Sequence, residues 1–548
     1  MKVNQDQSLP PTVGEALLEA LKAYGVDHAF GVPGNHTVAL YRGFNAAGIK
    51  HITCRHEQGA AFMADGYARA IGRPGVCVLI SGPGLLNAAT AIAQALADSI
   101  PLLVITGVAP VADLGMGRGT LHELPDQRAT AASFCRSSHT LLDPDNLPTL
   151  IGAAFNAFAT ARPGPVHLEI PLDLMDERLS EPPAFKVPDL APPGPDLEAL
   201  KRAAQRLEAS EQPLLLIGGG TQNASQEVTA LAERLDAPVL NTTNGKGVVH
   251  RDHPLAVGGS PSLPCLRHAL AEADLVLAIG TELGETDYDL LMAGPLKRPQ
   301  QLLRIDIDSS ALLSTFSPDL GLVADAAGAC QVLLEYLPAE HDRQGNKRTS
   351  KLREAVHAET HFHEEVQAFF AALDRAAPDA VIVGDSTRPT YYASWQLETP
   401  APRRYFHSVS GFGTLGYALP AGFGAAVAVA PEQSVIVLIG DGGIQFTLPE
   451  LSTAAAEGLP VAVIVWHNEG YREIENSMAA KGVPADSTLI KAPDFAAAAA
   501  AHGADYRRPK DTTELEAAVR EAHEASGPTL IEVREGEFLS TPSGGWYA

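Results

Sequence analysis

Short apolar runs that end in Gly, Asp or Asn recur along this chain, separated by helix-like amphipathic stretches. The clearest pair is Val435–Ile439 and Val461–Trp466, which flank the helix-like stretch Leu448–Glu457. Strands that alternate with helices favour parallel sheets, because two parallel strands need a crossover connection between them. The pattern therefore predicts the α/β class, with doubly wound parallel sheets.

Two breaks divide this pattern into three regions. Ser180 to Leu197 contains six prolines in eighteen positions, a composition that cannot sustain a helix or a central strand, so we predict an extended linker. The second break is the polar stretch from Pro338 to Lys351. We expect domains at residues 1–180, 198–337 and 357–548.

Charge and cysteine content limit the partners and the compartment. Sixty-five acidic residues against forty Lys and Arg give a net charge of −25, without a sustained basic run, so neither nucleic acid nor a membrane surface is an expected partner. The five cysteines are scattered and form no C-x-x-C pair, which argues against a disulfide framework or a thiolate zinc site. With no signal peptide or membrane span visible, a reducing cytoplasm is the expected location.

The two strand-like runs at 435–466 also carry the most informative polar residues. Asp441 follows the first run and Asn468 follows the second. Because a βαβ unit brings both carboxyl ends to one edge of the sheet, we expect these residues to lie close together. A carboxylate, an amide oxygen and the nearby Gly470 carbonyl form a hard oxygen set that suits Mg²⁺, and the glycines at 440, 442 and 443 allow backbone amides to approach a pyrophosphate. The alternative is an ordinary turn of Gly, Asp and Asn.

A second segment, His56–Ala61, follows a strand-like run and opens a helix rich in small residues. Taken alone, Glu57 is more simply explained as a helix-start carboxylate favoured by the helix dipole. Together with a metal and pyrophosphate site, however, Glu57 completes a set of residues that resembles the cofactor site of a known enzyme family.

These residues resemble the thiamine diphosphate enzymes of the acetolactate synthase and 2-oxoacid decarboxylase superfamily. Asn468 lies twenty-seven positions after Asp441, which is the spacing of that family's cofactor signature. The likeness covers nearly the whole chain, through the motifs Gly31–Gly34, His56–Ala61, Gly66–Arg69, Ser81–Gly84, Gly245–Gly247, Gly411–Pro420 and Gly440–Gly442. It implies an N-terminal pyrimidine-binding domain, a middle domain and a C-terminal diphosphate-binding domain.

The resemblance also implies a role for each matching residue. Glu57 would hydrogen-bond the aminopyrimidine ring of thiamine diphosphate and promote loss of the thiazolium C2 proton, a task that needs a carboxyl group in a dry cleft. Asp441, Asn468 and the Gly470 carbonyl would hold Mg²⁺, while Leu415 would prop the cofactor in its bent form. The expected cofactor contacts are Pro33, Gly34, Glu57, Gly413, Leu415, Gly440, Asp441, Gly442, Gly443, Asn468, Gly470 and Tyr471.

Members of this family place the glutamate and the diphosphate site of one active site on different subunits. The resemblance therefore implies a homo-oligomer, a dimer at least and commonly a tetramer, with active sites at the dimer interface. Acetolactate synthases also bind FAD in the middle domain through a Gly-Ala-Arg stretch. Here that stretch is Gly280-Thr281-Glu282, so the arginine is missing, which argues against FAD.

One motif points to a different enzyme class. Gly411 to Gly416 satisfies G-x-G-x-x-G, a pattern also found in nicotinamide-dependent dehydrogenases. The acidic residue expected about twenty positions later is not clearly placed, because Asp441 belongs to its own glycine cluster. Dehydrogenation is the weaker interpretation.

Several positions separate this chain from acetolactate synthases. Those enzymes carry Phe and Gln where this chain has Leu121 and His122, and an apolar residue near Glu473. The string Gly117–Arg128 resembles a branch that includes 5-guanidino-2-oxopentanoate decarboxylase. We therefore expect substrate contacts at Leu121, His122, Glu123 and Glu473, since a guanidinium pairs well with a carboxylate, and His122 is the natural proton relay. Solvated surface acids and a structural loop histidine are the alternatives.

Three functions remain open. The first is a carbon–carbon lyase that decarboxylates a 2-oxoacid, with 5-guanidino-2-oxopentanoate giving 4-guanidinobutanal and CO₂ as the best guess. The second is an acetolactate synthase-type carboligase acting on pyruvate. The third is an inactive paralogue, against which the intact Glu57, Asp441 and Asn468 argue.

Overall fold

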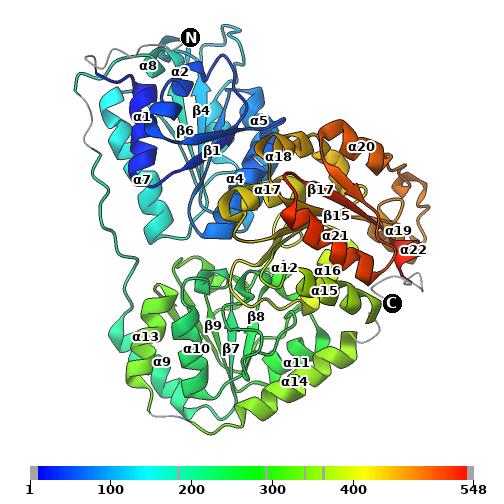
Figure 1. Cartoon of the computed structure of the whole chain (residues 1–548). Coiled ribbons are helices and arrows are strands. Elements are labelled where there is room, and N and C mark those ends of the chain that lie inside the picture. Colours follow the sequence, from blue (N-terminus) through cyan, green and yellow to red (C-terminus); the bar gives the residue numbers. More distant parts are fainter. Residues whose placement is uncertain (1–9, 182–184, 290–293, 339–340, 361–363, 540–548) are drawn as a thin grey trace.

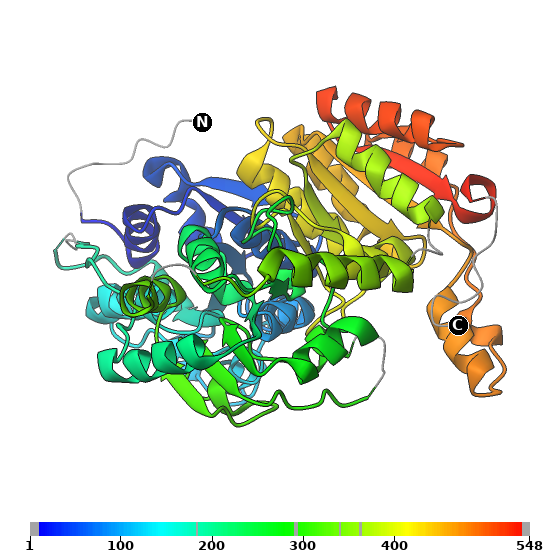
Figure 2. The same cartoon turned by 90° about the horizontal axis from the view of Figure 1, so that it is seen from below.

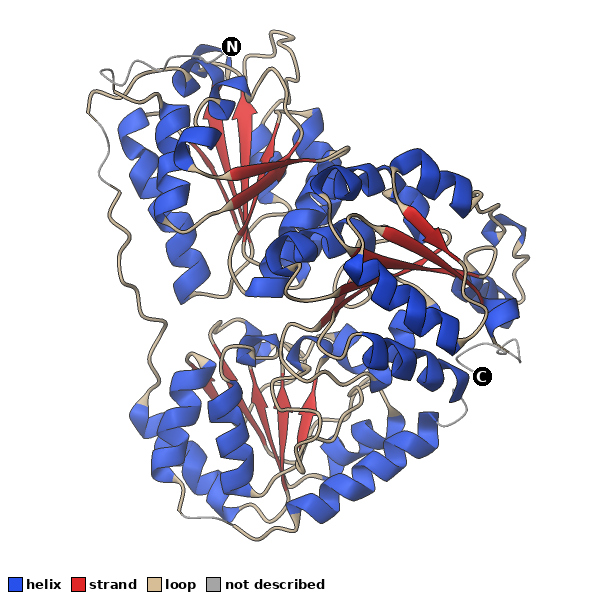
Figure 3. Cartoon of the chain, in the orientation of Figure 1, coloured by secondary structure: helices blue, strands red, loops and turns tan. Residues whose placement is uncertain are grey.

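Three parallel sheets, one in each third of the chain, organise the protein. The computed structural model describes residues 10–181, 185–289, 294–338, 341–360 and 364–539. Helices flank each sheet (Figure 3), and the pairings between the named strands are all parallel. The predicted fold class is confirmed.

The N-terminal sheet has the strand order β2-β1-β3-β4-β6-β5, and this order reverses direction between β1 and β3. Its strands are β1 (His28–Gly31), β2 (Lys50–Thr53), β3 (Gly75–Leu79), β4 (Leu102–Val108), β5 (Ser137–Thr140) and β6 (Pro165–Pro171). Its helices are α1 (Val13–Ala23), α2 (Val38–Tyr41), α3 (Phe44–Ala47), α4 (Glu57–Ile71), α5 (Pro83–Ala97), α6 (Gln127–Ala132), α7 (Leu147–Thr160) and α8 (Leu172–Met175).

The predicted linker contains no helix or strand over its described residues 185–196. It runs along the outside of the molecule from the N-terminal to the middle part (Figure 1). The middle sheet has the order β11-β10-β9-β7-β8. Its elements are α9 (Leu197–Ala209), β7 (Pro213–Ile217), α10 (Ser225–Leu235), β8 (Val239–Asn241), α11 (Pro264–Glu272), β9 (Leu275–Ile279), α12 (Glu285–Tyr288), β10 (Leu302–Asp306), β11 (Leu320–Val323), α13 (Ala326–Tyr336) and α14 (Gly345–Thr360).

The C-terminal sheet has the order β13-β12-β14-β15-β17-β16, which reverses direction between β12 and β14. Its strands are β12 (Val381–Gly384), β13 (Tyr405–His407), β14 (Val435–Gly440), β15 (Val461–His467), β16 (Asp505–Arg507) and β17 (Thr529–Arg534). Its helices are α15 (Glu364–Ala376), α16 (Arg388–Gln396), α17 (Ala418–Val429), α18 (Leu451–Glu457), α19 (Arg472–Ala480), α20 (Phe495–His502), α21 (Thr512–Glu524) and α22 (Glu535–Phe538).

Helices α4 and α17 join the N-terminal and C-terminal parts (Figure 1). A Cβ atom on Gly66 would lie 1.9 Å from the Ala421 carbonyl oxygen, and one on Gly424 would lie 1.9 Å from the Met63 carbonyl oxygen. The two backbones approach so closely that only glycine fits at both positions. One buried apolar cluster continues across this contact from one sheet to the other.

Helix α19 lies at the periphery, and none of its residues is buried. It belongs to the orange segment that projects from the C-terminal part in Figure 2. Within the part of the chain that the structure describes, no helix is both long and apolar enough to cross a membrane.

Candidate active site

The turn after β14 holds Asp441 in a defined position. The Asp441 N–H donates to the Trp466 carbonyl on the neighbouring strand at 3.1 Å. Its carboxylate accepts hydrogen bonds from the Gly442 N–H at 2.9 Å and the Glu469 N–H at 2.7 Å. Burial raises the pKa of Asp441, while these N–H groups and the nearby His467 oppose the rise. The ends of β14 and β15 therefore meet at one edge of the sheet, as the sequence predicts.

The neighbouring turn supplies neutral oxygens. The Asn468 side-chain amide donates to Glu535 Oε2 at 3.3 Å, which turns its Oδ1 atom the other way. Glu469 and Gly470 adopt φ angles of +66° and +150°, and this bends the chain back beside Asp441. In the described ranges no group of three or more His, Cys, Asp or Glu side chains could hold a metal ion. A metal at this turn would thus be held by one carboxylate together with amide, carbonyl and ligand oxygens, a set that suits Mg²⁺.

A second buried carboxyl group lies beside this turn. Asp385 follows β12, so Asp385 and Asp441 flank the point where the strand order reverses, which is the usual ligand position in such sheets. Asp385 accepts hydrogen bonds from the Ser386 N–H at 2.9 Å and the Ala418 N–H at 3.1 Å. Burial raises the pKa of Asp385 to about 7. Sequence analysis did not identify this residue.

The glycines of the signature line the same turn. Gly440 ends β14, and Gly443 opens the short helix η7 (Gly443–Phe446). The ring of Tyr471 lies against Gly442, since a Cβ atom there would be 2.7 Å from Tyr471 Cε1. The structure therefore groups these predicted cofactor residues with Asp441.

The loop that carries Gly413 and Leu415 lies between β13 and α17. Its backbone is held by Ser408, whose hydroxyl donates to the Thr414 carbonyl at 2.7 Å, and by Gln94 of the N-terminal part, which accepts from the Thr414 hydroxyl at 3.2 Å. Leu415 is half-buried. Because β13 is an edge strand, this glycine-rich loop is not at the strand reversal, where a dinucleotide motif would be expected.

Glu57 is the first residue of α4 and is half-buried. The Asn87 side chain on α5 donates a hydrogen bond to Glu57 Oε2 at 3.0 Å. Pro33 and Gly34 follow β1 at the same edge of the N-terminal sheet. Among the described residues of the single chain, no hydrogen bond joins Glu57 to the turn of Asp441. We therefore describe Glu57 and the turn of Asp441 as two half-sites, which no direct hydrogen bond joins within the described residues.

The loop with Leu121, His122 and Glu123 borders a cavity of about 260 Å³. His122 has a positive φ of +62°, and its ring meets that of His36 edge-on with centroids 4.9 Å apart. Glu123 accepts hydrogen bonds from the N–H groups of Gly119 at 2.6 Å and Thr120 at 3.1 Å, so its carboxylate shapes the loop. Leu121 is 59% exposed. Leu121 is therefore open to solvent, and the half-buried His122 lines the cavity beside His36, while Glu123 already has backbone partners.

Glu473 lies in an ion pair at the base of α19. Its Oε1 atom accepts from Arg388 Nε at 2.8 Å, and Arg388 also pairs with Glu535. The Glu473 side chain is 18% exposed, yet its Oε2 atom is buried and has no hydrogen-bond partner within the described residues. One carboxylate oxygen of Glu473 therefore lies beneath the surface of the single chain without a protein partner among the described residues.

Comparison with known proteins identifies the chain. Three family models match in order: the thiamine pyrophosphate enzyme N-terminal TPP binding domain at residues 11–130, the central domain at 200–333 and the C-terminal TPP binding domain at 384–533. The chain belongs to the thiamine pyrophosphate enzyme family. It is therefore a thiamine diphosphate-dependent enzyme.

Individual relatives in this family cover nearly the whole chain. The probable 2-ketoarginine decarboxylase AruI of Pseudomonas aeruginosa is 42% identical over 95% of this chain and 94% of that protein. The probable acetolactate synthase large subunit of Methanocaldococcus jannaschii is 30% identical over 95% of this chain and 91% of its own length. The acetolactate synthase large subunit of Parasynechococcus marenigrum is 32% identical over 97% and 89%.

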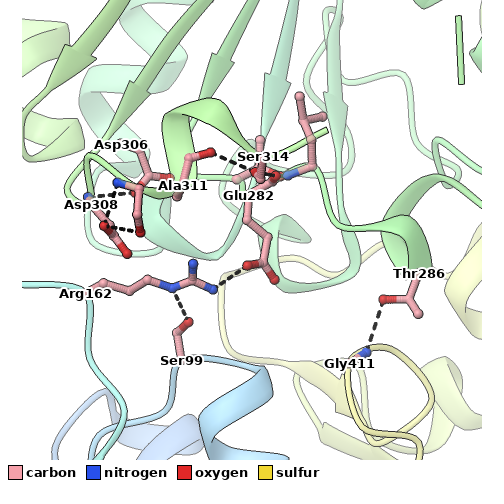
Figure 4. Close-up of polar contacts among 12 residues, drawn as sticks. Ser99, Arg162, Glu282, Thr286, Asp306, Asp308, Ala311, Ser314 and Gly411 are labelled. Atoms are coloured by element: carbon pink, nitrogen blue, oxygen red, sulfur yellow. Dashed lines mark hydrogen bonds and ion pairs between the residues drawn. The ribbon is translucent and has the colours of Figure 1, made fainter. Parts of the chain in front are cut away.

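The middle part of this thiamine diphosphate enzyme has its own cavity, of about 330 Å³, where the three parts meet. Glu282 follows β9 and pairs there with Arg162 of the N-terminal part, which also donates to the Ser99 hydroxyl at 2.7 Å (Figure 4). Asp306 lies at the end of β10 beside them. Glu282 thus pairs with the Arg162 guanidinium, which is then not free to bind a phosphate group of FAD. The absence of FAD remains our prediction.

Sequence reasoning missed His36, Asn87, Arg388 and Glu450. Asn87 lies 30 positions from its partner, and Glu450 lies 394 positions from the backbone N–H that it accepts from, so no local pattern connects them. His36 follows the Gly31–Gly34 motif directly and could have been included with it.

Proposed function

We propose that this enzyme decarboxylates 5-guanidino-2-oxopentanoate to 4-guanidinobutanal and CO₂. The observation that carries the proposal is the buried, unpartnered Oε2 atom of Glu473, because a carboxylate oxygen is the natural acceptor for a guanidinium. The similarity to a protein named probable 2-ketoarginine decarboxylase supports the same substrate class, since 2-ketoarginine is this guanidino acid.

Each proposed site residue has a task in this reaction. Thiamine diphosphate, when bound, supplies the electron sink for the bond to the departing carboxylate. Glu57 exchanges a proton with the cofactor's pyrimidine nitrogen, and Asn87 holds one oxygen of that carboxylate in place. Asp441, with Asn468 and the Gly470 carbonyl, holds Mg²⁺ on the diphosphate.

The remaining proposed site residues bind and orient the cofactor and the substrate. Leu415 supports the cofactor from the loop after β13. Pro33, Gly34, Gly413, Gly440, Gly442, Gly443 and Tyr471 form the rest of the proposed cofactor surface. His122 is the proposed proton relay. Leu121 and Glu123, which line the same cavity, and Glu473 of the C-terminal part are the proposed substrate contacts.

We further propose a homo-oligomer in which one chain completes the site of another. The resemblance to enzymes that place these two half-sites on different subunits supports this. Apolar side chains near both half-sites are exposed in the single chain: Leu86 is 46%, Phe412 55% and Phe446 53% exposed. Domain limits at 1–180, 198–337 and 357–548 and a cytoplasmic location, which five unpaired cysteines favour, belong to the same proposal.

The test is a panel of 2-oxoacids assayed for CO₂ and for the carbon product. We expect the guanidino acid to give the highest kcat/KM, with CO₂ and the aldehyde in equal amounts. The similarity to acetolactate synthases keeps carboligation as the second candidate. Acetolactate formed from pyruvate as the preferred reaction would establish that candidate and reject the lyase.

A further inference from the structure

Glu450 joins the C-terminal part of the chain to the start of helix α4. It ends the short helix η8 (Leu448–Glu450), nine positions after Asp441, and is 1% exposed. Its Oε1 atom accepts hydrogen bonds from the backbone N–H of Arg55 at 3.0 Å and of His56 at 2.9 Å. A buried carboxylate near the diphosphate half-site thus accepts from the backbone N–H groups of the two residues that directly precede Glu57.

The shape of α4 is adapted to this carboxylate. A Cβ atom on Gly59 would lie 2.2 Å from Glu450 Oε1 and 2.6 Å from its Cδ atom. Only glycine allows the carboxylate to lie against the first turn, which gives a physical reason for the glycine in the His56–Ala61 motif. The partial positive charge at the start of a helix also favours an anion at this place.

Further contacts keep Glu450 in position. The Thr453 hydroxyl donates to Oε2 at 2.6 Å, and the Arg55 N–H also reaches this atom at 3.2 Å. Burial raises the pKa of Glu450, and these hydrogen bonds oppose the rise. The segment from Asp441 to Glu450 therefore connects the proposed metal turn with the backbone of the proposed catalytic carboxylate.

We propose that Glu450 is a positioning residue for Glu57. It holds the first turn of α4 so that the Glu57 carboxylate keeps one defined place, with Asn87 holding that carboxylate from the other side. Proton exchange depends steeply on geometry, and a displacement of about 1 Å can cost about a hundredfold in rate. This inference rests on the proposed role of Glu57, and thus on the proposed function.

The test compares Glu450→Gln and Glu450→Asp with wild type in the full-length protein with thiamine diphosphate and Mg²⁺. The amide presents N–H atoms where the backbone needs an acceptor, and Asp is one methylene too short to keep both contacts. Two quantities are measured: the rate of hydrogen–deuterium exchange at C2 of the bound cofactor, and backbone amide exchange of residues 55–58 by mass spectrometry.

We expect both variants to slow C2 exchange by about tenfold or more, in line with the geometric sensitivity of proton transfer. Backbone exchange should increase at Arg55 and His56. Cofactor affinity should stay within about twofold of wild type, because no proposed diphosphate contact is removed.

The matched control is Tyr417→Phe. The Tyr417 hydroxyl donates to Asp65 at 2.6 Å, and this bond also joins α4 to the C-terminal part, but at the middle of the helix. The control should lower the unfolding temperature and leave C2 exchange unchanged.

Wild-type C2 exchange in both Glu450 variants would overturn the inference, and so would an equal loss in Tyr417→Phe. If wild type itself shows no cofactor-dependent C2 exchange, the proposed function fails first. The two failures are therefore distinguishable.

Discussion

Replacing Glu473 by Gln should alter substrate choice far more than stability. Arg388 loses one carboxylate partner but keeps Glu535, so the variant retains a counter-ion for the buried guanidinium. The Glu473 side chain is 18% exposed and that of Arg388 7% exposed, so solvent screens a charge here only weakly. Gln keeps the shape of the side chain but has a single acceptor oxygen, so with that oxygen on Arg388 the position proposed to meet the substrate carries an uncharged NH₂ donor.

The size of the effect follows from the contact that is lost. A hydrogen bond to a charged group contributes about 1.5–3 kcal/mol. At about 1.4 kcal/mol for each factor of ten, kcat/KM for 5-guanidino-2-oxopentanoate should fall by roughly 10- to 150-fold. A 2-oxoacid of similar length with an uncharged side chain makes no such contact, and its kcat/KM should change by less than about threefold.

The assay is the ratio of kcat/KM for these two substrates, measured in wild type and Glu473→Gln. Glu475→Gln is the matched control, because Glu475 lies on the same helix and pairs with Arg472 at 2.7 Å, away from Arg388. A wild-type ratio in Glu473→Gln, or an equal fall in the control, would remove Glu473 from substrate recognition.

Three further outcomes are expected. Glu57→Gln should bind the cofactor and slow C2 exchange by about a hundredfold, since an amide accepts from Asn87 but exchanges no proton; a wild-type exchange rate would make Glu57 structural. Chelation by EDTA should abolish activity until Mg²⁺ returns, and Asp441→Asn should weaken Mg²⁺ binding measured by calorimetry; unchanged affinity would exclude Asp441 as a ligand. Burial raises the pKa of Asp385 from 3.8 to about 7, so its contribution to stability is complete below about pH 4 and is lost as pH rises through about 7. Urea unfolding of the cofactor-free protein should show this loss, and an Asp385→Asn variant with the wild-type pH slope would contradict it.

Sequence reasoning succeeded where topology alone determines position. The juxtaposition of Asp441 and Asn468 follows from the βαβ rule, and the structure places both at one edge through the bond from the Glu469 N–H to Asp441. The continuous apolar runs likewise predicted the central strands. Strand β6 is not such a continuous run, although all seven of its residues are buried, because His167 and Glu169 stand between its apolar residues.

Contacts between distant segments could not be predicted in this way. The two carboxylates at 473 and 535 converge on Arg388 from different elements, and no spacing in the sequence indicates that they share a cation. Glu123 shows a second limit of prediction from sequence. Its carboxylate suggests a contact with the substrate, but in the folded loop that carboxylate already accepts hydrogen bonds from the backbone N–H groups of Gly119 and Thr120.

The glycine-mediated contact between α4 and α17 also determines how the molecule can open. With Gly66 and Gly424 pressed against opposing carbonyl groups, and a shared core beneath them, these two lobes form one mechanical unit without a hinge. Helix α19, which buries no residue and is tied near its start to Arg388 by Glu473, can shift without breaking this unit, so a substrate bound at Glu473 would also fix the position of the helix.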